Sequence, residues 1–191
     1  MAIKGLAQAA RLGYCRLMMI RVASLSLALL TGIAVASLPA RAQQGEVTTL
    51  GTFTDWTAHS YSGKDGLVCF VMSSPKKTLP ENVKRDPSYI LITHRPKLNV
   101  RSEVSAMVGY TLKKDSTAVM EIDDAESYEL FTAGDGAWAE SAAKDKQIVA
   151  ALKKGGRMIL KGVSWRGTKT ADTYSLSGIT AAMDKIDEVC K

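Results

Sequence analysis

Histidine and cysteine, the residues that most often build hydrolytic and zinc sites, are scarce in this chain. It has only two histidines, His59 and His94, and three cysteines among 191 residues. No G-x-S-x-G segment presents a serine as a nucleophile, and two histidines far apart in sequence offer no visible zinc-ligand set. We therefore expect no catalytic residue, cofactor or metal. One enzymatic alternative stays open, an accessory enzyme that uses His94 with nearby acids.

Two further segments lack the spacing that would make them binding motifs. The acidic run at 121–126 has neither the ligand spacing nor the central glycine of a calcium loop. The Gly-Lys pair within 62–66 lacks the remaining residues of a phosphate-binding loop. We interpret the first segment as a solvated turn that follows a strand, and the second as a polar hairpin turn.

Acidic residues are missing altogether from the start of the chain. The charged side chains of residues 1–21 are all basic, and residues 22–38 contain no charged side chain. An Ala-x-Ala site follows, which places the expected cleavage between Ala42 and Gln43. A basic region, an apolar core and a small-residue cleavage site together predict that residues 1–42 are a secretory signal peptide.

An uncleaved membrane anchor is the alternative for this N-terminal segment. Its 17 uncharged residues are at the short limit of a membrane span. Nothing after Ala42 resembles a second membrane segment, so we expect no span once the signal peptide is removed. Met18 and Met19 offer a second translation start, which would make residues 1–17 a start-site error.

Removing the signal peptide also removes the excess of positive charge. The whole chain has 25 basic and 19 acidic residues, a formal net charge of +6. Five of the basic residues and none of the acidic ones lie in residues 1–42, so 20 basic and 19 acidic residues remain, a net charge of +1. A nearly neutral domain gives no support for nucleic-acid binding, which needs a concentrated positive surface.

The same cleavage leaves two of the three cysteines. Cys15 departs with the signal peptide, and Cys69 and Cys190 remain. An even number of cysteines in an exported chain favours a disulfide, because the periplasm and the exterior are oxidising. The alternative is a pair of free, buried thiols. A Cys69–Cys190 bond would tie the last turn of the chain to an early strand.

The remaining residues, 43–191, are predicted to form a single β-rich domain. The segments of strand character are short, rich in β-branched or aromatic residues, and bounded by turn residues. They cover roughly 53–60, 67–73, 89–94, 104–112, 118–122, 128–132, 157–165 and 170–177. Turn chemistry is found at 62–66, 75–87, 113–116 and 134–136.

Two later segments have helical periodicity instead. Apolar residues at 148, 149 and 152 share one face of a helix over 141–154, with Gly155 as its expected left-handed cap. At the C-terminus Ile179, Ala182, Met183, Ile186 and Cys190 also fall on one face. The predicted fold is mainly β, an antiparallel β-sandwich or curved sheet with one internal helix and a C-terminal helix.

Basic residues are concentrated between 153 and 169, and this stretch is the one surface feature that suggests a ligand. It could form a strip that meets acidic glycans, anionic lipid or a partner; a solvated face balanced by acids elsewhere is the alternative. Its members are Lys153, Lys154, Arg157, Lys161, Arg166 and Lys169. The three tryptophans are expected at core or rim positions.

The segment GGRMILKGVSWRGT at 155–168, continued by KTADTYSLSG at 169–178 and a helix that ends in Cys190, resembles the invasion-associated locus B family of Gram-negative envelope proteins. Phe53-Thr54-Asp55-Trp56, the Cys69-Phe70 strand and the Ala137-Trp138 pair agree with it. The resemblance covers residues 47–190. We assign to its signature Trp56, Trp138, Gly162, Ser164, Gly167, Thr168, Asp172, Tyr174, Leu176 and Gly178.

This resemblance implies an exported β-rich domain that is associated with host-cell invasion in pathogenic members, with no enzyme activity or cofactor. Many members carry a cysteine shortly after the equivalent of Trp56, but residues 57–60 of this chain contain none. The function expected is a non-catalytic binding module of the periplasm or cell surface, whose partner is an envelope or host-surface component. A periplasmic stress or folding-assistance protein is the alternative. Neither the ligand nor the oligomeric state follows from the sequence.

Overall fold

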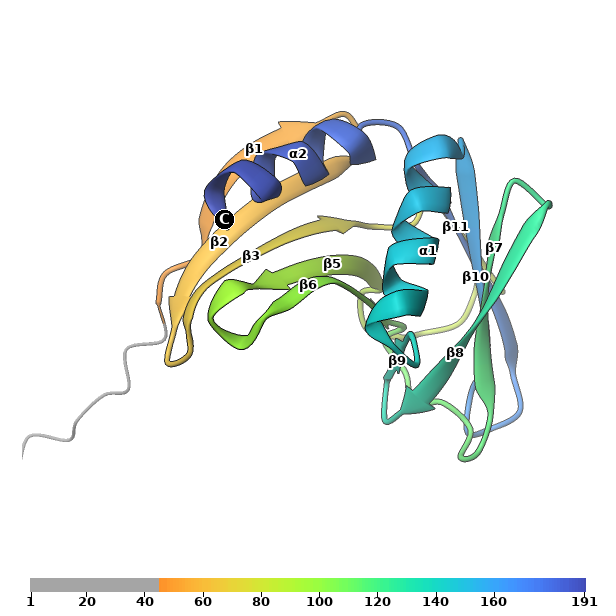
Figure 1. The fold of residues 1–191 in the computed structure, drawn as a ribbon. Helices are drawn as coiled ribbons and strands as arrows, with labels where there is room; N and C mark the ends of the chain where they lie inside the picture. The colour runs from red at the N-terminus through yellow and green to blue at the C-terminus, as the bar shows by residue number, and fades with distance from the viewer. Residues whose placement is uncertain (1–44) are drawn as a thin grey trace, which may run out of the picture. The chain divides into compact units, whose positions relative to one another are not determined.

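The computed structural model describes residues 45–191, in which eleven strands form one antiparallel sheet (Figure 1). The predicted signal peptide, its Ala42–Gln43 cleavage site and Cys15 lie outside the described residues. The strands are β1 Thr48–Phe53, β2 Trp56–Gly63, β3 Gly66–Ser73, β4 Lys77–Leu79, β5 Tyr89–Arg95, β6 Val100–Met107, β7 Thr117–Ile122, β8 Glu126–Ala133, β9 Gly136–Trp138, β10 Arg157–Val163 and β11 Lys169–Ser175. The helices are α1 Ala142–Lys154 and α2 Ile179–Val189, with a 3₁₀ turn at Pro96–Leu98.

The sheet is open, with the order β1-β2-β3-β5-β6-β9-β8-β7-β10-β11-β4. Figure 1 shows that it curves, so that β5 and β6 lie on one side of α1 while β10 and β11 lie on the other. Helix α2 packs on β1, β2 and β3. The mainly-β prediction is thus confirmed, in its curved-sheet form and with both helices.

Alternation along the strands determines which side chains reach the core. In β10 Met158 and Leu160 are buried, and in the neighbouring β11 the inward positions are Thr170, Asp172 and Tyr174. Successive residues of a strand point to opposite faces, so these side chains share one face of the sheet. Two of the three inward positions in β11 are polar and need partners.

The two helices bury the faces that the periodicity predicts. Ser141 caps the N-terminus of helix α1, since its hydroxyl accepts a hydrogen bond from Lys144 N at 3.3 Å, and the helix buries Ile148 and Leu152. Helix α2 buries Ile179, Ala182, Met183 and Ile186 against the β1–β3 end of the sheet. Cys190, just beyond its last turn, is also buried.

The predicted strand over 53–60 begins too early, because β2 starts only at Trp56. The structure has a hairpin there, because the chain turns at Thr54 and Asp55 between β1 and β2, with Thr54 at φ 53°. No glycine or proline marks this turn in the sequence. A tertiary contact stabilises it instead, since Asp55 N donates to Ser177 O at 3.2 Å.

Three further strands differ from the prediction. Strand β6 covers Val100–Met107 rather than 104–112, and it ends early because Gly109 leaves the strand at φ +72° and packs against the Asp86 carbonyl. Gly136 was expected in a turn but opens β9, and β4 lies inside the 75–87 segment that was expected to be turn only. Strands β4 and β9 have three residues each, too few to show a period.

Gly155 ends α1, but not as the expected left-handed cap. Its φ is −81° and its conformation is extended. A glycine is needed here for space, because a Cβ would lie 2.6 Å from Ile122 Cγ2. The next two amides, Gly156 N and Arg157 N, donate to the carboxylate of Asp123, which directs the chain from α1 into β10.

Candidate functional site

Cys69 and Cys190 form a disulfide that spans 121 residues of sequence. Cys69 lies in β3 and Cys190 follows α2; the two Cα atoms are 6.0 Å apart and both residues are buried. The predicted pair is therefore present in the structure, and it fastens the C-terminal helix to the sheet.

His94 lies beside this disulfide, because β5 pairs Cys69 with His94. Its side chain is 0 % exposed. Nδ1 accepts a hydrogen bond from Ser102 N at 3.0 Å, so in a neutral ring the hydrogen is on Nε2, which donates to Asp187 Oδ1 at 2.8 Å. Both nitrogens are thus occupied in joining β5 to β6 and α2, and neither is free to meet a substrate in this conformation.

Two signature glycines have backbone conformations that other residues rarely adopt. Gly178 has φ +92° ahead of α2, and a Cβ there would lie 1.9 Å from the carbonyl oxygen of Phe53. Gly167 has φ +85° in the loop between β10 and β11, with nothing within 4 Å of a Cβ. The first glycine is required by close packing and by φ, the second by φ alone.

A buried polar network connects the signature strand β11 to the 80–88 segment. Arg85 forms an ion pair with Asp172, and its Nη1 also donates to Val108 O at 3.3 Å. Ser88 Oγ donates to Asp172 Oδ2 at 3.1 Å. A serine has a single hydroxyl hydrogen, so the 2.8 Å contact between Ser88 Oγ and Tyr174 must be donated by the tyrosine.

Burial controls the electrostatics of this network. It raises the pKa of the Tyr174 phenol, which therefore stays protonated and able to donate. Burial alone would lower the pKa of Arg85, but the hydrogen bond and charge of Asp172 outweigh it and hold the pKa above its ordinary value. In residues 45–191 no buried side-chain nitrogen or oxygen lacks a partner. The network is therefore fully satisfied and rigid.

A second pair of hydroxyls extends the polar contacts toward the surface. Thr170 Oγ1 donates to Gly162 O at 3.4 Å, and the Tyr110 hydroxyl lies 2.5 Å from Thr170 Oγ1. A Cβ at Gly162 would lie 2.8 Å from the same Tyr110 oxygen. Gly162 thus leaves the space in which Tyr110 reaches β11, while the Arg85 guanidinium lies 5.8 Å from the centre of the Tyr110 ring.

Two further signature residues, Ser164 and Thr168, shape the loop between β10 and β11. Ser164 N donates to Thr168 O at 2.9 Å, and Ser164 Oγ accepts from Thr168 N at 3.2 Å. Trp165 N donates to Thr111 O at 2.9 Å. These bonds hold the Trp165 side chain at the surface, 61 % exposed, with the Arg166 guanidinium 4.8 Å from its ring centre.

We use the name signature pocket for the hollow between this loop and the 80–88 segment. Its volume is about 270 Å³. The Tyr110, Arg85 and Thr170 side chains that line it belong to the polar contacts described above, and its remaining lining is Val83, Lys84, Thr111, Ser164, Trp165, Arg166 and Thr168. No carboxylate lines it.

The structure divides the predicted basic strip into two parts. Three members pair with acids: Lys153 with Asp184, Arg157 with Asp124 and Lys161 with Glu121. In the part of the chain that the structure describes, Lys154, Arg166 and Lys169 take part in no ion pair. The strip is not one continuous positive surface, because its middle is neutralised.

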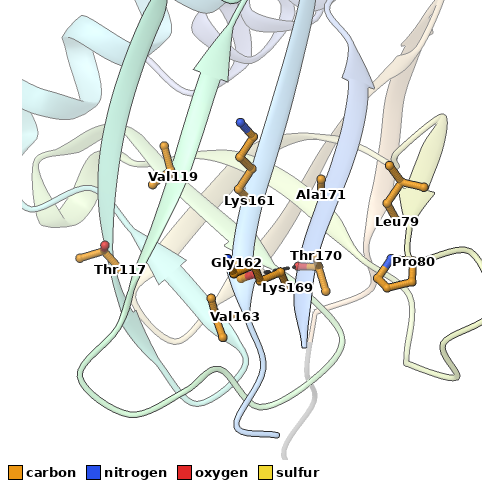
Figure 2. A pocket seen from close by; sticks show the side chains of 10 residues that line it. All are labelled: Leu79, Pro80, Thr117, Val119, Lys161, Gly162, Val163, Lys169, Thr170 and Ala171. Atoms are coloured by element: carbon orange, nitrogen blue, oxygen red, sulfur yellow. Dashed lines mark hydrogen bonds between the residues drawn. The ribbon is translucent and has the colours of Figure 1, made fainter. Parts of the chain in front are cut away.

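A second hollow, the outer groove, is lined by residues of β4, β7, β10 and β11 and has a volume of about 400 Å³. Figure 2 shows Val119, Lys161 and Ala171 side by side on β7, β10 and β11, with Leu79 beyond them on β4. Leu79 is 43 % exposed. The lining is mostly apolar, and the two lysines Lys161 and Lys169 are its charged members.

Trp56 and Trp138, the signature tryptophans, do not reach the signature pocket. Trp56 is fully buried and its Nε1 donates to Ser175 O at 3.0 Å, which ties β2 to the end of β11. Trp138 stacks on Phe131 with 5.7 Å between ring centres. These positions agree with the core and rim roles expected for the tryptophans, whereas Trp165, which is 61 % exposed, departs from that expectation. Leu176, also in the signature, is buried and its amide donates to Gly156 O.

The sequence reasoning missed Arg85, Ser88 and Tyr110, which complete the network and the pocket. Arg85 lies in a segment interpreted as turn, so nothing local singled it out. One signal was present: Asp172 alternates with Thr170 and Tyr174 on an inward face, and a buried carboxylate requires a cationic or hydrogen-bonding partner.

Two further properties concern residues 45–191 as a whole. Their helices are too short or too polar to cross a membrane. No three histidine, cysteine or acidic side chains in this part of the chain are grouped in a way that could hold a metal ion.

Comparisons with known proteins agree with the fold and the signature. The profile of the family described as Invasion associated locus B (IalB) protein matches residues 56–187. The crystal structure of invasion associated protein B from Bartonella henselae is similar, with a TM-score of 0.52 and 18% identity over 74% of this chain and 97% of that one. A search of curated proteins gives no match. Because the profile covers most of the described residues, this chain belongs to the invasion associated locus B protein family.

Proposed function

We propose that this chain is an exported, non-catalytic protein of the Gram-negative envelope that binds an envelope or host-surface component through the signature pocket. In this proposal residues 1–42 are removed as a signal peptide and residues 43–191 form the working domain, in the periplasm or at the cell surface. The family name associates its relatives with invasion, so a host-surface component is one class of partner for this chain.

The observation that carries the proposal is the way in which Trp165 is presented. A large aromatic side chain that is 61 % exposed costs solvation free energy. Its loop is nevertheless held by hydrogen bonds to Thr111 and within Ser164–Thr168, in front of a completely satisfied polar network. Exposed aromatic and arginine side chains on rigid frames are typical of binding hot spots.

His94 supports a non-catalytic role. Catalytic histidines need a nitrogen within reach of a substrate, but His94 is 0 % exposed and both of its nitrogens are occupied. An enzyme that uses His94 remains the competing hypothesis. A hydrolase activity of the purified protein that disappears on His94→Ala would contradict the proposal.

Capture from envelope extract tests the binding role. Wild-type protein, Trp165→Ala and a control, Phe131→Ala, serve as baits; Phe131 is also an exposed aromatic residue, 51 % exposed, but lies on β8 outside the pocket. We expect a component that wild type and Phe131→Ala retain and Trp165→Ala loses. Equal capture by all three baits would exclude the signature pocket as the binding surface. Cell fractionation tests the exported location.

The outer groove favours a second candidate function, folding assistance in the periplasm. Apolar surface at an exposed site can hold the apolar segments of unfolded chains. Leu79→Asp should then reduce the ability of the protein to suppress aggregation of an unfolded client. Leu67→Asp is the matched control, because Leu67 is 39 % exposed but lies on β3, outside the groove. No suppression by wild type would exclude this candidate.

A further inference from the structure

We propose that the signature pocket binds an acidic saccharide, a sugar unit that carries a carboxylate or a phosphate. This inference rests on the proposed binding function and assigns a ligand class to its pocket. It is carried by three properties of the lining: unpaired cations, an exposed aromatic plane and free hydroxyl groups.

The first property is positive charge that no ion pair among residues 45–191 neutralises. Lys84 and Arg166 line the pocket and, among residues 45–191, neither has a carboxylate partner. Arg85 is the third cation, but Asp172 already neutralises it. Two unpaired cations without a lining acid create a positive potential that attracts an anion, and a guanidinium binds carboxylate or phosphate with paired hydrogen bonds.

The second property is the aromatic plane beside these cations. Arg166 covers one face of Trp165, since its guanidinium lies 4.8 Å from the ring centre. The ring is still 61 % exposed, which leaves surface for a ligand. The apolar C–H face of a sugar ring packs on such a plane, while its hydroxyl groups remain at the edge. An anionic group on the same sugar would then lie within reach of Arg166.

The third property is the supply of hydroxyl groups. Ser164, Thr111 and Thr168 line the pocket, and Ser164 Oγ accepts from Thr168 N, so its own hydrogen can be donated to a ligand. Sugar hydroxyls both donate and accept, and a lining of hydroxyls suits them. The pocket volume of about 270 Å³ is slightly below the roughly 300–1,000 Å³ of sites for drug-sized ligands, which fits one sugar unit rather than a long chain.

The basic strip provides the contrast that makes the assignment specific. Arg157 and Arg166 belong to the same strip, but Arg157 pairs with Asp124 outside the pocket, whereas Arg166 lies over Trp165 at its edge. A ligand attracted by charge alone would respond to both residues. A ligand held in the pocket responds to Arg166 only.

Calorimetric titration of the purified protein tests the proposal with two pairs of probes. Galacturonate is compared with its neutral methyl ester, and glucose 1-phosphate with glucose. We expect at least one acidic probe to bind and both neutral counterparts to bind at least tenfold more weakly. A tighter carboxylate probe indicates a uronic acid glycan as the source, and a tighter phosphate probe indicates a phosphorylated sugar.

Variants then locate the site. Arg166→Gln should weaken binding about tenfold, because one hydrogen bond to a charged group is lost. Trp165→Ala should weaken binding by a similar factor, because the contact area between the ring and the sugar is lost. Arg157→Gln, which removes the same charge, should change affinity less than about twofold. Thermal unfolding of each variant confirms that it is folded.

Three results would overturn the acidic-saccharide assignment: no binding of either acidic probe, equal binding of the neutral counterparts, or an equal loss in Arg157→Gln and Arg166→Gln. If the probes fail while Trp165→Ala still abolishes capture of an envelope component, the proposed function stands and only the ligand class is wrong. If capture is also insensitive to Trp165→Ala, both are wrong.

Discussion

The two ends of the sheet are fastened by different means. At the β1–β3 end, a disulfide between Cys69 and Cys190 holds α2 on the strands. At the β10–β11–β4 end, the buried network of Arg85, Ser88, Asp172 and Tyr174 holds the 80–88 segment instead. The covalent link fixes one contact, whereas the network fixes several orientations at once, because each of its hydrogen bonds has a preferred direction.

This difference matches the surfaces that the two ends present. Beside the disulfide, His94 is buried and fully hydrogen bonded. Above the network lies the signature pocket, with Trp165 and Arg166 at the surface. We infer that the disulfide end maintains the fold and that the network end carries the binding function, so damage to one should leave the other measurable.

The largest effect is expected from removing the disulfide. The double variant Cys69→Ser, Cys190→Ser should lose about 4 kcal/mol of unfolding free energy, because the bond closes a loop of more than 100 residues in the unfolded chain. Urea denaturation measures the loss. Ligand affinity at the signature pocket should stay the same under conditions where the variant is folded.

Thiol labelling provides the control for this comparison. The protein without its signal peptide is unfolded but not reduced, and then labelled. No reactive cysteine should be found at positions 69 and 190. Two reactive cysteines there, or an unchanged unfolding free energy in the double variant, would contradict the role given to the disulfide.

Breaking the network should reduce the free energy of unfolding almost as much as removing the disulfide does. Asp172→Asn leaves the Arg85 guanidinium, whose side chain is only 10 % exposed, without its counter-charge. Such a change costs about 3 kcal/mol and should also weaken binding at the pocket. Asp184→Asn is the matched control, because its ion pair with Lys153 is exposed and contributes at most about 1 kcal/mol. Similar losses in both variants would show that the network has no special role.

Substitutions of the two signature glycines should show how much stability depends on close packing and how much on backbone conformation. Gly178→Ala should lose about 3 kcal/mol, since a positive φ and a clash with the Phe53 carbonyl act together. Gly167→Ala has a positive φ but open space, so it should lose only about 1 kcal/mol. Denaturation curves of the two variants measure the difference, and equal losses would contradict the close contact at Gly178.

The smallest effects concern pH. Hydrogen bonds from the Gly156 and Arg157 amides lower the pKa of Asp123. Asp123 therefore stabilises the fold above its unfolded pKa, and this contribution is lost as pH falls through the lower, folded pKa. Burial raises the pKa of Asp145, on α1. Its charged form is disfavoured, so stability is lost as pH rises through that raised pKa.

Carboxyl chemical shifts followed by NMR test both directions. Asp123 should titrate below, and Asp145 above, the ordinary range of an aspartate. Asp123→Asn should make acid unfolding less steep. If the two carboxyl groups titrate together, the hydrogen bonds and the burial assigned to them are wrong.

Local patterns in the sequence predicted one class of features well. The periodicity of 179–190 predicted the buried face of α2, and β-branched and aromatic residues between turn residues predicted β10 and β11 within about two residues. The cysteine pair was predicted because only two cysteines remain after the signal peptide is removed. These features depend on short-range periodicity or on a unique pairing, both of which can be read in a single sequence.

Features that depend on distant contacts were not predictable in the same way. Strand β4 has three residues and is formed by its pairing with β11, and the Thr54–Asp55 turn is fixed by Ser177. Arg85 and Tyr110 join Asp172 and Thr170 across more than 50 residues of sequence. The signature identified one half of the pocket, but the other half comes from Tyr110, Thr111 and the 80–88 segment, where no local pattern indicates a site.

The most direct test of the account is to map where a ligand binds without choosing a site in advance. Amide signals of labelled protein are followed by NMR while the tighter acidic sugar probe is added. We expect the largest shifts at Ser164–Thr168, Lys84, Arg85 and Tyr110, with little change near Cys190 and His94. Largest shifts around His94 and Asp187, or across the outer groove, would contradict this expectation.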